Sequence, residues 1–457
     1  MVSMPVRLLC LVQDFNFMLA SYDRFYLEHV IELSKTEKIV FIDNVLTDKN
    51  MMLLERDTVF NPHIYDLLRK HKLQKPLDDL IFVSHRLEMS DVIARIWLLI
   101  KQTPYLQALC KSLPQRELAV NTISHVALSI VLLNKLTVMQ RRLPDLFDHS
   151  IQVAMMAVAI GSELRVAGPL LTMLATAGLL HDLGELHINP QLYQAKTKLS
   201  ETEWREIYTH PLIAFAILNQ CPEIPIPVAK AVLEHHERMN GSGYPQGFSG
   251  NKLGHLGRIL AVAEVVTAIC QKEPVAQVAT LFKSCNSNLD DNVVKAVHAL
   301  LRRMITQISP IKTDLAGAVV DTAELSQLCR MVTRIMRAWK KLGPTLDEHP
   351  MERARRLFER ITQIQYSLLD AGVQPDDCEE SVKKFVGETE PLREILTLLR
   401  EVCFQLGAAI NETQRGWNFN AEKKSDTTIA VDKWLRQTRN TLNQLGNANS
   451  QIDEEED

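Results

Sequence analysis

The feature that most constrains the fold is a set of histidines and acidic residues spaced by roughly the length of one helix and its connection. Its members are His149, His181, Asp182, His210, His235, His236 and Glu264. The gaps between successive members, leaving out the two adjacent pairs, run from 25 to 32 residues. Each gap holds one helix, a turn and a return, so the side chains can converge on one point from successive helices. The pattern predicts a helical bundle around a shared polar site.

The residue types in this set indicate the chemistry of the site. Adjacent residues such as His235 and His236 do not share a helix face, but both can reach a site at a seam between helices. Imidazoles mixed with carboxylates suit divalent Zn, Fe or Mn better than Mg or Ca, which prefer oxygen ligands. A single helical histidine is more often packed or solvated than ligating. The whole set in register favours a metal site.

The order and spacing of these motifs between residues 125 and 285 resemble the HD-GYP family, the bacterial branch of the HD superfamily of metal-dependent phosphohydrolases. The resemblance rests on the His181-Asp182 pair, on the separated histidines, and on the turn Gly243-Tyr244-Pro245 that closely follows His235-His236. It implies an all-helical core and two or three divalent transition-metal ions, Fe or Mn rather than Zn. It also implies hydrolysis of cyclic di-GMP or a related phosphoester in bacterial signalling.

The resemblance further implies a role for each member of the set. The implied metal ligands are His149, His181 and Glu264 for one ion, His210, His235 and His236 for the other, and Asp182 as a bridge between them. Asp182 and His181 are the implied catalytic residues. Asp145, four residues before His149, is either a ligand of a third metal or a solvated aspartate near a helix start. Glu237 is expected to orient one of the histidines.

The expected substrate side comprises Gly243, Tyr244, Pro245 and Glu185, and this chain departs from the family pattern there. Glu185 stands where the family has lysine. The stretch from Glu273 to Ala276 stands where the family carries Arg-Pro-Tyr-Arg, and Glu264 replaces the usual aspartate ligand. A carboxylate in place of a cation repels a phosphate, so turnover of cyclic di-GMP is expected to be weak or lost.

Two functions therefore stay open. The first is a metal-dependent phosphodiesterase acting on a cyclic dinucleotide. The second is a degenerate HD-GYP module that keeps its metal or its fold and serves as a binding or scaffolding protein. A homodimer or signalling partner proteins are compatible with both. A net charge of -4 argues against a polymeric nucleic acid as partner, because such a surface would be basic.

The chain of 457 residues predicts about three domains. Residues 1–110 are expected to form a small α/β module for sensing or dimerisation, with strands at 38–42 and 51–54 joined by a turn at 47–50. Residues 125–285 are the HD-GYP-like domain, and residues 290–457 a helical region with an acidic tail at 453–457. Eight dispersed cysteines without a Cys-x-x-Cys motif predict free thiols, and the cytoplasm is the expected compartment because no apolar run reaches the ~20 residues of a membrane span.

Periodicity and end signals predict the individual helices. Around the site we expect helices at 145–164, at 168–183, from the Ser200 capping box to His210, from Pro227 to His236, and at 256–270. In the C-terminal region we expect helices at 292–308, 322–342, 351–369 and 389–410. A helix is also expected to start at Asn61-Pro62, because asparagine caps a helix and proline suits its first position.

Overall fold

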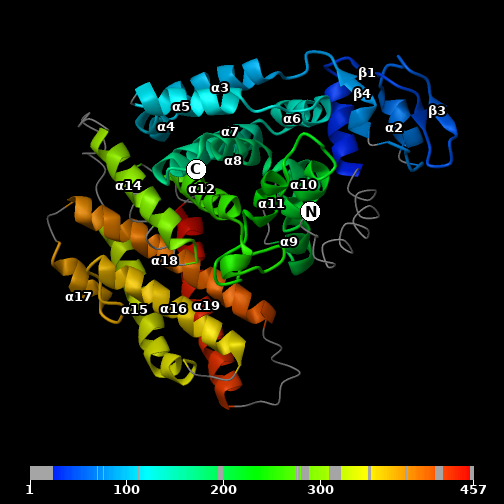
Figure 1. Cartoon of the computed structure of the whole chain (residues 1–457). Helices are drawn as coiled ribbons and strands as arrows, with labels where there is room; N and C mark the ends of the chain where they lie inside the picture. The colour runs from blue at the N-terminus through cyan, green and yellow to red at the C-terminus, as the bar shows by residue number, and fades with distance from the viewer. Residues whose placement is uncertain are drawn as a thin grey trace. The chain divides into compact units, whose positions relative to one another are not determined.

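The computed structural model describes most of the chain between residues 24 and 452. The residues it leaves out are 1–23, 69, 76, 112, 194–198, 274, 276–277, 279–281, 283–287, 308–320, 348–350, 386–388, 417–425 and 453–457. The described chain is mainly α-helical with four short strands, which confirms the predicted fold class (Figure 1). It divides into two compact units: Met1–Val275 with Asn288–Ile308, and Ala276–Ser287 with Ser309–Asp457. The functional division into 1–110, 125–285 and 290–457 stays a prediction.

The N-terminal part of the first unit contains two small antiparallel sheets. Strand β1 (Ile39–Phe41) pairs with β4 (Ile81–Val83), and β2 (Val45–Leu46) pairs with β3 (Met52–Leu54). The predicted hairpin was wrong in its pairing, because the turn at 47–50 joins β2 to β3 and not the 38–42 strand to β3. The first strand ends before Asp43 and Asn44, where the chain bends. The Asp43 carboxylate accepts the Asn44 N–H at 2.8 Å in this bend.

Further short helices complete this part of the first unit. Helix α2 (Pro62–Leu68) starts as predicted, with the Asn61 side chain accepting the backbone N–H of His63 at 3.0 Å. The others are helical residues 24–34, the 3₁₀ turn η1 (Leu77–Asp79), α3 (Met89–Gln102), α4 (Pro104–Leu109), α5 (Leu113–Ser124) and α6 (Ile130–Arg142). Helices α5 and α6 pack against α7 (Pro144–Glu163), the central helix of the bundle that holds the site.

The bundle that positions the site is built around three helices in close contact. Its elements are α7 (Pro144–Glu163), α8 (Gly168–Leu180), the 3₁₀ turns η2 (Leu183–His187), η3 (Pro190–Leu192) and η4 (Gly250–Lys252), α9 (Glu201–Ile207), α10 (His210–Leu218), α11 (Ile226–Glu234), α12 (His255–Lys272) and α14 (Asp291–Gln307). Helices α8 and α12 both pack on α7. The approach of α8 to α7 needs a glycine, since a Cβ on Gly178 would lie 2.5 Å from the Cα of Ala154.

Three of the predicted helices end earlier than expected, and all three ends lie at the site. Helix α11, expected to run to His236, stops at Glu234, so His235 and His236 follow its end. Helix α8 stops at Leu180, so His181 and Asp182 occupy the turn into η2. There η2 packs so tightly on α10 that a Cβ on Gly184 would lie 2.1 Å from the carbonyl oxygen of His210. The capping-box helix α9 ends at Ile207, and His210 begins α10 instead. Pro211 explains this break, because proline cannot donate to the preceding turn and disfavours a helical residue before it.

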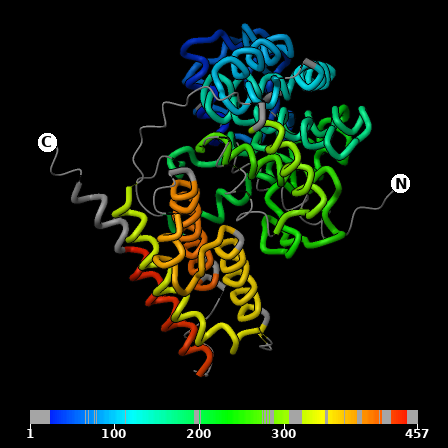
Figure 2. The backbone as a smooth tube through the Cα atoms, turned by 90° about the vertical axis from the view of Figure 1, so that its left-hand side faces the viewer, coloured from blue at the N-terminus to red at the C-terminus, as the bar shows by residue number. Residues whose placement is uncertain are grey.

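The second unit is a separate helical bundle with its own apolar core (Figure 2). Its elements are α15 (Thr322–Leu342), η6 (Gly343–Thr345), α16 (Glu352–Asp370), α17 (Cys378–Lys383), α18 (Thr389–Gly416) and α19 (Asp426–Ile452). Trp339 of α15 and Trp434 of α19 are buried in contact, with ring centroids 4.8 Å apart. Helix α15 coincides with the predicted 322–342, whereas α17 and α19 were not predicted. The acidic tail lies outside the described residues.

Two further expectations concern cysteines and membrane spans. The six cysteines in the described ranges are free thiols, and all six are buried. Cys10 and Cys285 lie outside those ranges. Among the described helices, none combines the length and the apolar character needed to cross a membrane.

Candidate metal centre

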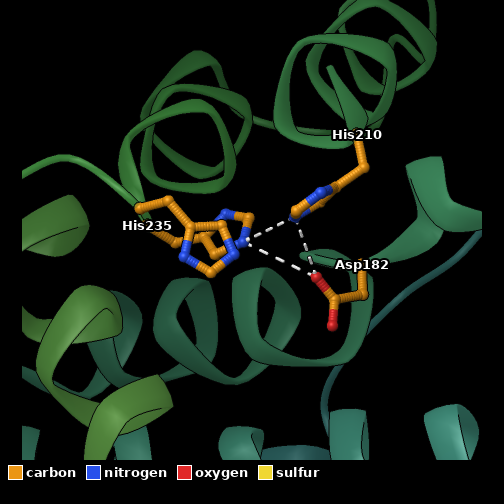
Figure 3. A group of neighbouring side chains, drawn as sticks. Asp182, His210 and His235 are labelled. Carbon is orange, nitrogen blue, oxygen red and sulfur yellow. Dashed lines mark hydrogen bonds and ion pairs between the residues drawn. The ribbon is translucent and has the colours of Figure 1, made fainter. Parts of the chain in front are cut away.

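The centre of the site is the carboxylate of Asp182, whose two oxygens face different histidines. Figure 3 shows the side of this carboxylate that faces His210 and His235. Its Oδ1 lies 3.4 Å from Nε2 of His210 and 3.5 Å from Nε2 of His235. Its Oδ2 lies 3.0 Å from Nε2 of His181. Asp182 is 5% exposed and the His181 and His235 side chains are fully buried, so this contact is shielded from bulk water.

A second carboxylate closes the side of the site formed by α7 and α12. Glu264 places its Oε2 2.9 Å from Nε2 of His149 and 3.4 Å from Nε2 of His181. His149 also lies 3.9 Å from Asp182 Oδ2. Glu264 therefore reaches His149 and His181, two histidines that Asp182 also contacts. The longer glutamate side chain is thus accommodated where the family has aspartate.

The structure brings the predicted ligands into two groups that share one residue. Each group has its potential ligand atoms within 4.8 Å of one another: Asp182, His210, His235 and His236 in one, and His149, His181 and Asp182 in the other. Glu264 adjoins the second group through its contacts with His149 and His181. Asp145 is exposed in the first turn of α7 and belongs to neither group among the described residues.

Three of the histidines have their tautomer set by the backbone of the helix that ends just before them. Nδ1 of His181, His210 and His235 each contacts the backbone carbonyl three residues earlier, at 2.9, 2.8 and 2.5 Å. A carbonyl only accepts, so Nδ1 carries the hydrogen and Nε2 presents a lone pair. The Nε2 atoms of His210 and His235 then face each other at 3.3 Å.

This arrangement fits a divalent cation. Lone pairs of imidazole and carboxylate facing one another across 2.9–3.5 Å repel unless a proton or a cation lies between them. Nε2 of His181 and Oδ1 of Asp182 are buried and lack a hydrogen-bond partner within the described parts of the chain. Buried polar atoms of native proteins are rarely left so, and a bound ion is one of the standard explanations.

The carboxylates control the charge of the histidines nearest to them. Burial disfavours the imidazolium of His181, but the adjacent Asp182 carboxylate raises its pKa well above the usual value of 6.5. Burial likewise opposes the charged form of His149, whose pKa is nevertheless raised by Glu264. In return, burial would raise the pKa of Asp182, but the neighbouring His181 holds it well below its usual range.

The remaining histidines of the site favour the neutral form that binds a metal. Burial lowers the pKa of His235 to about 4, and burial together with His235 lowers the pKa of His236. His210 is the exception: burial lowers its pKa, but the hydrogen bond and the charge of Asp182, with the charge of Glu185, together outweigh burial and raise it. Glu264 stays ionised, since His149 overcomes the effect of burial and keeps the pKa of this carboxyl well below its usual range.

The glycine-rich loop lies directly against the group of Asp182, His210, His235 and His236. Tyr244 stacks on His236, with centroids 4.6 Å apart, and on Tyr208 at 4.2 Å. Gly243 allows this approach, because a Cβ there would lie 2.4 Å from the carbonyl oxygen of His236. Glu237 was expected to orient a histidine, but among the described residues its carboxylate instead accepts backbone N–H groups of the loop after Pro245. The donors are Gln246 at 2.7 Å and Phe248 at 3.1 Å.

The departures from the family pattern occupy different positions. Glu185 is half-buried in η2, and burial and the nearby Asp182 raise its pKa to about 7. Tyr193 lies in contact with it, and burial and Glu185 raise the pKa of this phenol. Glu273 follows the end of α12. Ala276 lies outside the described residues.

Three polar side chains near His149 were missed by the sequence analysis. Nδ1 of His149 lies 3.3 Å from Oε1 of Gln271, which in turn contacts Gln152. Gln152 is also contacted by Tyr105. Helical spacing could have indicated the two glutamines, because Gln152 follows His149 by three residues and Gln271 follows Glu264 by seven, which is two turns.

Comparison with known proteins shows which family the segment around the site is similar to. Residues 132–289 match the family model described as HD domain. A cyclic di-GMP phosphodiesterase of Pseudomonas aeruginosa is 29% identical over 156 residues, which cover 33% of this chain and 38% of the relative. The 3'3'-cGAMP-specific phosphodiesterase 1 of Vibrio cholerae is 33% identical over 128 residues, covering 28% of this chain and 30% of the relative.

The class defined by fold and site is thus a helical domain with a buried histidine–carboxylate cluster. Residues 132–289 match the HD domain family model, and this match with the similarity to named cyclic-dinucleotide phosphodiesterases confirms the family resemblance noted in the sequence. The cluster and the HD domain together point to divalent metal binding. The chain spans about a third of the length of these two relatives, at 38% and 30%.

Proposed function

We propose that the protein is a metal-dependent phosphodiesterase that hydrolyses a cyclic dinucleotide, with cyclic di-GMP as the first candidate. The observation that carries this proposal is that one carboxylate, Asp182, faces two separate groups of imidazoles. A carboxylate suits that position because it offers two oxygens, whereas an imidazole offers one lone pair. The names of the relatives, which act on cyclic di-GMP or 3'3'-cGAMP, support the substrate class.

The two groups of the site, together with Glu264, are proposed to hold two ions. Fe or Mn suits this mixture of nitrogen and oxygen donors. When bound, a pair of divalent ions lowers the pKa of a shared water and neutralises charge on phosphoryl oxygens. Asp182 and His181 are the proposed catalytic residues. Asp182 remains a carboxylate at neutral pH because its pKa is lowered, despite burial, by His181. A third ion near Asp145 is a further proposal.

The loop of Gly243, Tyr244 and Pro245 is proposed to face the substrate. Tyr244 is stacked between His236 and Tyr208, so its ring is held in a fixed orientation beside the group that contains His236. Because these two rings cover its faces, Tyr244 is proposed to meet the substrate with its edge and its hydroxyl rather than by stacking on a base. The loop is therefore proposed to contact the cyclic dinucleotide next to the groups that act on its phosphate.

The proposal is tested with the full-length protein reconstituted with Fe²⁺ or Mn²⁺. We expect two or more metal equivalents per chain by elemental analysis. Cyclic di-GMP and 3'3'-cGAMP are then incubated with the protein, and linear dinucleotides and mononucleotides are separated by chromatography. Hydrolysis that disappears in the Asp182→Ala variant supports the proposal. A protein that holds no metal after reconstitution contradicts it.

The alternative, a binding or scaffolding protein without turnover, is favoured by Glu185. Its pKa is raised by burial and by Asp182, so its carboxyl lies near the central carboxylate of the site. At an effective dielectric of ~20, a carboxylate about 4 Å from a phosphate costs about 4 kcal/mol before screening. Metal-bound protein that retains cyclic di-GMP without cleaving it would support this alternative over the first proposal.

Glu185→Lys is expected to raise the affinity for cyclic di-GMP by at least about tenfold, because it replaces repulsion by attraction at this position. Adding Glu273→Arg tests whether the second departure contributes. Affinity is measured by isothermal titration calorimetry, with metal content determined for each variant. Glu117→Lys, on the exposed side of α5, makes the same change in net charge and serves as the control. Equal affinities for the Glu185 and Glu117 variants would show that Glu185 does not face the phosphate.

A further inference from the structure

We propose that a relay of three side chains, Tyr105, Gln152 and Gln271, fixes the tautomer of His149 and thereby positions it as a metal ligand. The inference rests on the proposed metal centre. It concerns residues that the ligand set does not include, and Tyr105 lies before the segment 132–289 that matches the HD domain. Tyr105 is on α4, Gln152 on α7 and Gln271 on α12, so the relay joins three helices of the first unit (Figure 1).

The relay is a continuous chain of hydrogen bonds. The Tyr105 hydroxyl donates to Oε1 of Gln152. Nε2 of Gln271 donates to the same oxygen at 3.1 Å. Oε1 of Gln271 then lies 3.3 Å from Nδ1 of His149. Tyr105 and Gln152 are 2% and 7% exposed, whereas Gln271 is an exposed residue at the end of α12.

The buried end of the relay decides the orientation of the amides. The Tyr105 hydroxyl hydrogen goes to Gln152 Oε1, so that oxygen, not the amide nitrogen, faces both neighbours. Gln271 must then turn its NH₂ group toward Gln152 and its oxygen toward His149. Because an amide oxygen only accepts, His149 carries its hydrogen on Nδ1. Its Nε2 lone pair is left facing Glu264 Oε2 at 2.9 Å, where a metal ligand is needed.

The opposite orientation would disable this ligand. If both amides were reversed, the Gln271 NH₂ group would face Nδ1 of His149. The hydrogen of a neutral imidazole would then move to Nε2 and occupy the coordinating position. Reversal would also leave the buried Tyr105 hydroxyl facing an NH₂ group, and a buried hydroxyl without an acceptor costs about 1–3 kcal/mol. Tyr105 therefore selects the coordinating tautomer.

His149 depends on the relay because it lacks the backbone contact used by His181, His210 and His235. The carbonyl three residues before it, that of Leu146, accepts the Ser150 hydroxyl at 3.0 Å. His149 is thus a ligand whose tautomer is set by side chains from other helices. Partners of this kind orient ligating histidines in metal sites, and their loss commonly weakens metal affinity 10–100-fold.

The test measures Mn²⁺ affinity of the full-length, metal-free protein by competition with a chelating dye. Gln271→Met keeps the length of the side chain and removes both polar atoms, so we expect about tenfold weaker binding of one equivalent. Gln271→Glu loses the N–H donated to Gln152 but still accepts from Nδ1 of His149, so it should bind clearly more tightly than Gln271→Met. Lys272→Gln makes the same change in net charge as Gln271→Glu and should leave the affinity unchanged. Tyr105→Phe should weaken the same equivalent.

The visible spectrum of the Co²⁺-substituted protein gives a second readout, which should change in Gln271→Met and not in Gln271→Glu. Equal weakening in both Gln271 variants would assign the residue a packing role and overturn the relay. Wild-type affinity in Gln271→Met and Tyr105→Phe would also overturn it, while leaving the metal centre intact. Failure of the wild-type protein to bind Mn²⁺ would instead remove the metal centre on which the inference rests.

Discussion

Asp182 holds its position because two structural features meet at that residue. Helix α8 ends at Leu180, and the turn that follows is pressed against the start of α10 at Gly184. The carboxylate is thereby brought between His181 on one side and His210 and His235 on the other. A substitution at Asp182 should affect both groups of proposed ligands, whereas a substitution at Glu264 should affect one.

This difference predicts distinct metal contents for two variants. Asp182→Ala should reduce the metal content to well below one equivalent per chain, since both ions lose a ligand. Glu264→Ala should retain about one equivalent, because Asp182, His210, His235 and His236 remain. Elemental analysis after identical reconstitution distinguishes the two. Equal losses would mean that the ions bind cooperatively or that Asp182 does not bridge them.

The charges at the site predict how the stability of the metal-free protein varies with pH. The pKa values of His149, His181 and His210 are raised above 6.5 because nearby carboxylates outweigh burial. Their stabilising contribution is fully present below pH 6.5 and is lost as the pH rises through the raised values. The lowered pKa values of Asp182 and Glu264 contribute stability above about pH 4.5 that is lost at lower pH.

The chelated protein should therefore be most stable between about pH 4.5 and 6.5 and should lose stability toward pH 8. The metal-loaded protein should show the opposite trend across neutral pH, since metal binding displaces the protons from these histidines. Urea denaturation of the chelated and loaded forms at several pH values checks both curves. A chelated protein that gains stability between pH 6.5 and 8 would contradict the charge assignment.

At the scale of elements, the spacing of the ligands was sufficient to predict that helices converge on one site, but not how those helices end. Helix α15 has the predicted bounds because its apolar stripe and its Asp321 cap lie within the local sequence. The ends of α8 and α9 depend instead on contact with α10 and on Pro211. The relay to His149 could not be predicted, since its amides matter only once α4, α7 and α12 are packed.

The loop after His236 gives a prediction at this scale. In Gly243→Ala the new methyl group would lie 2.4–2.6 Å from backbone atoms of residues 236–238, so the loop must move. Overpacking of this kind costs about 1–3 kcal/mol, and it should also displace Tyr244 from His236. Gly168→Ala, at the first position of α8, meets no atom within 4 Å and is the matched control. Thermal denaturation should show a lower Tm for Gly243→Ala alone; equal Tm values would contradict the close approach.

At the scale of the whole molecule, the proposed ligands all belong to the first unit, and the second unit has an apolar core of its own. The buried cluster of the second unit runs from Leu325 to Leu435, with Trp339 and Trp434 among its members. The relay residue Tyr105 also belongs to the first unit. Metal binding should therefore not require the second unit, whose role we propose to be regulation or partner binding, alongside a sensing or dimerisation role for residues 1–110.

A division of the chain at residue 308 tests this independence. The fragment 1–308 should bind the same number of metal equivalents as the full chain, because it contains every residue of the two groups, Glu264 and the relay. The fragment 309–457 should be helical by circular dichroism and unfold cooperatively, since it contains the whole of its buried cluster. Elemental analysis and thermal denaturation of both fragments are compared with the intact protein. A folded fragment 1–308 that binds no metal, beside a loaded full-length protein, would show that the second unit helps to form the metal centre.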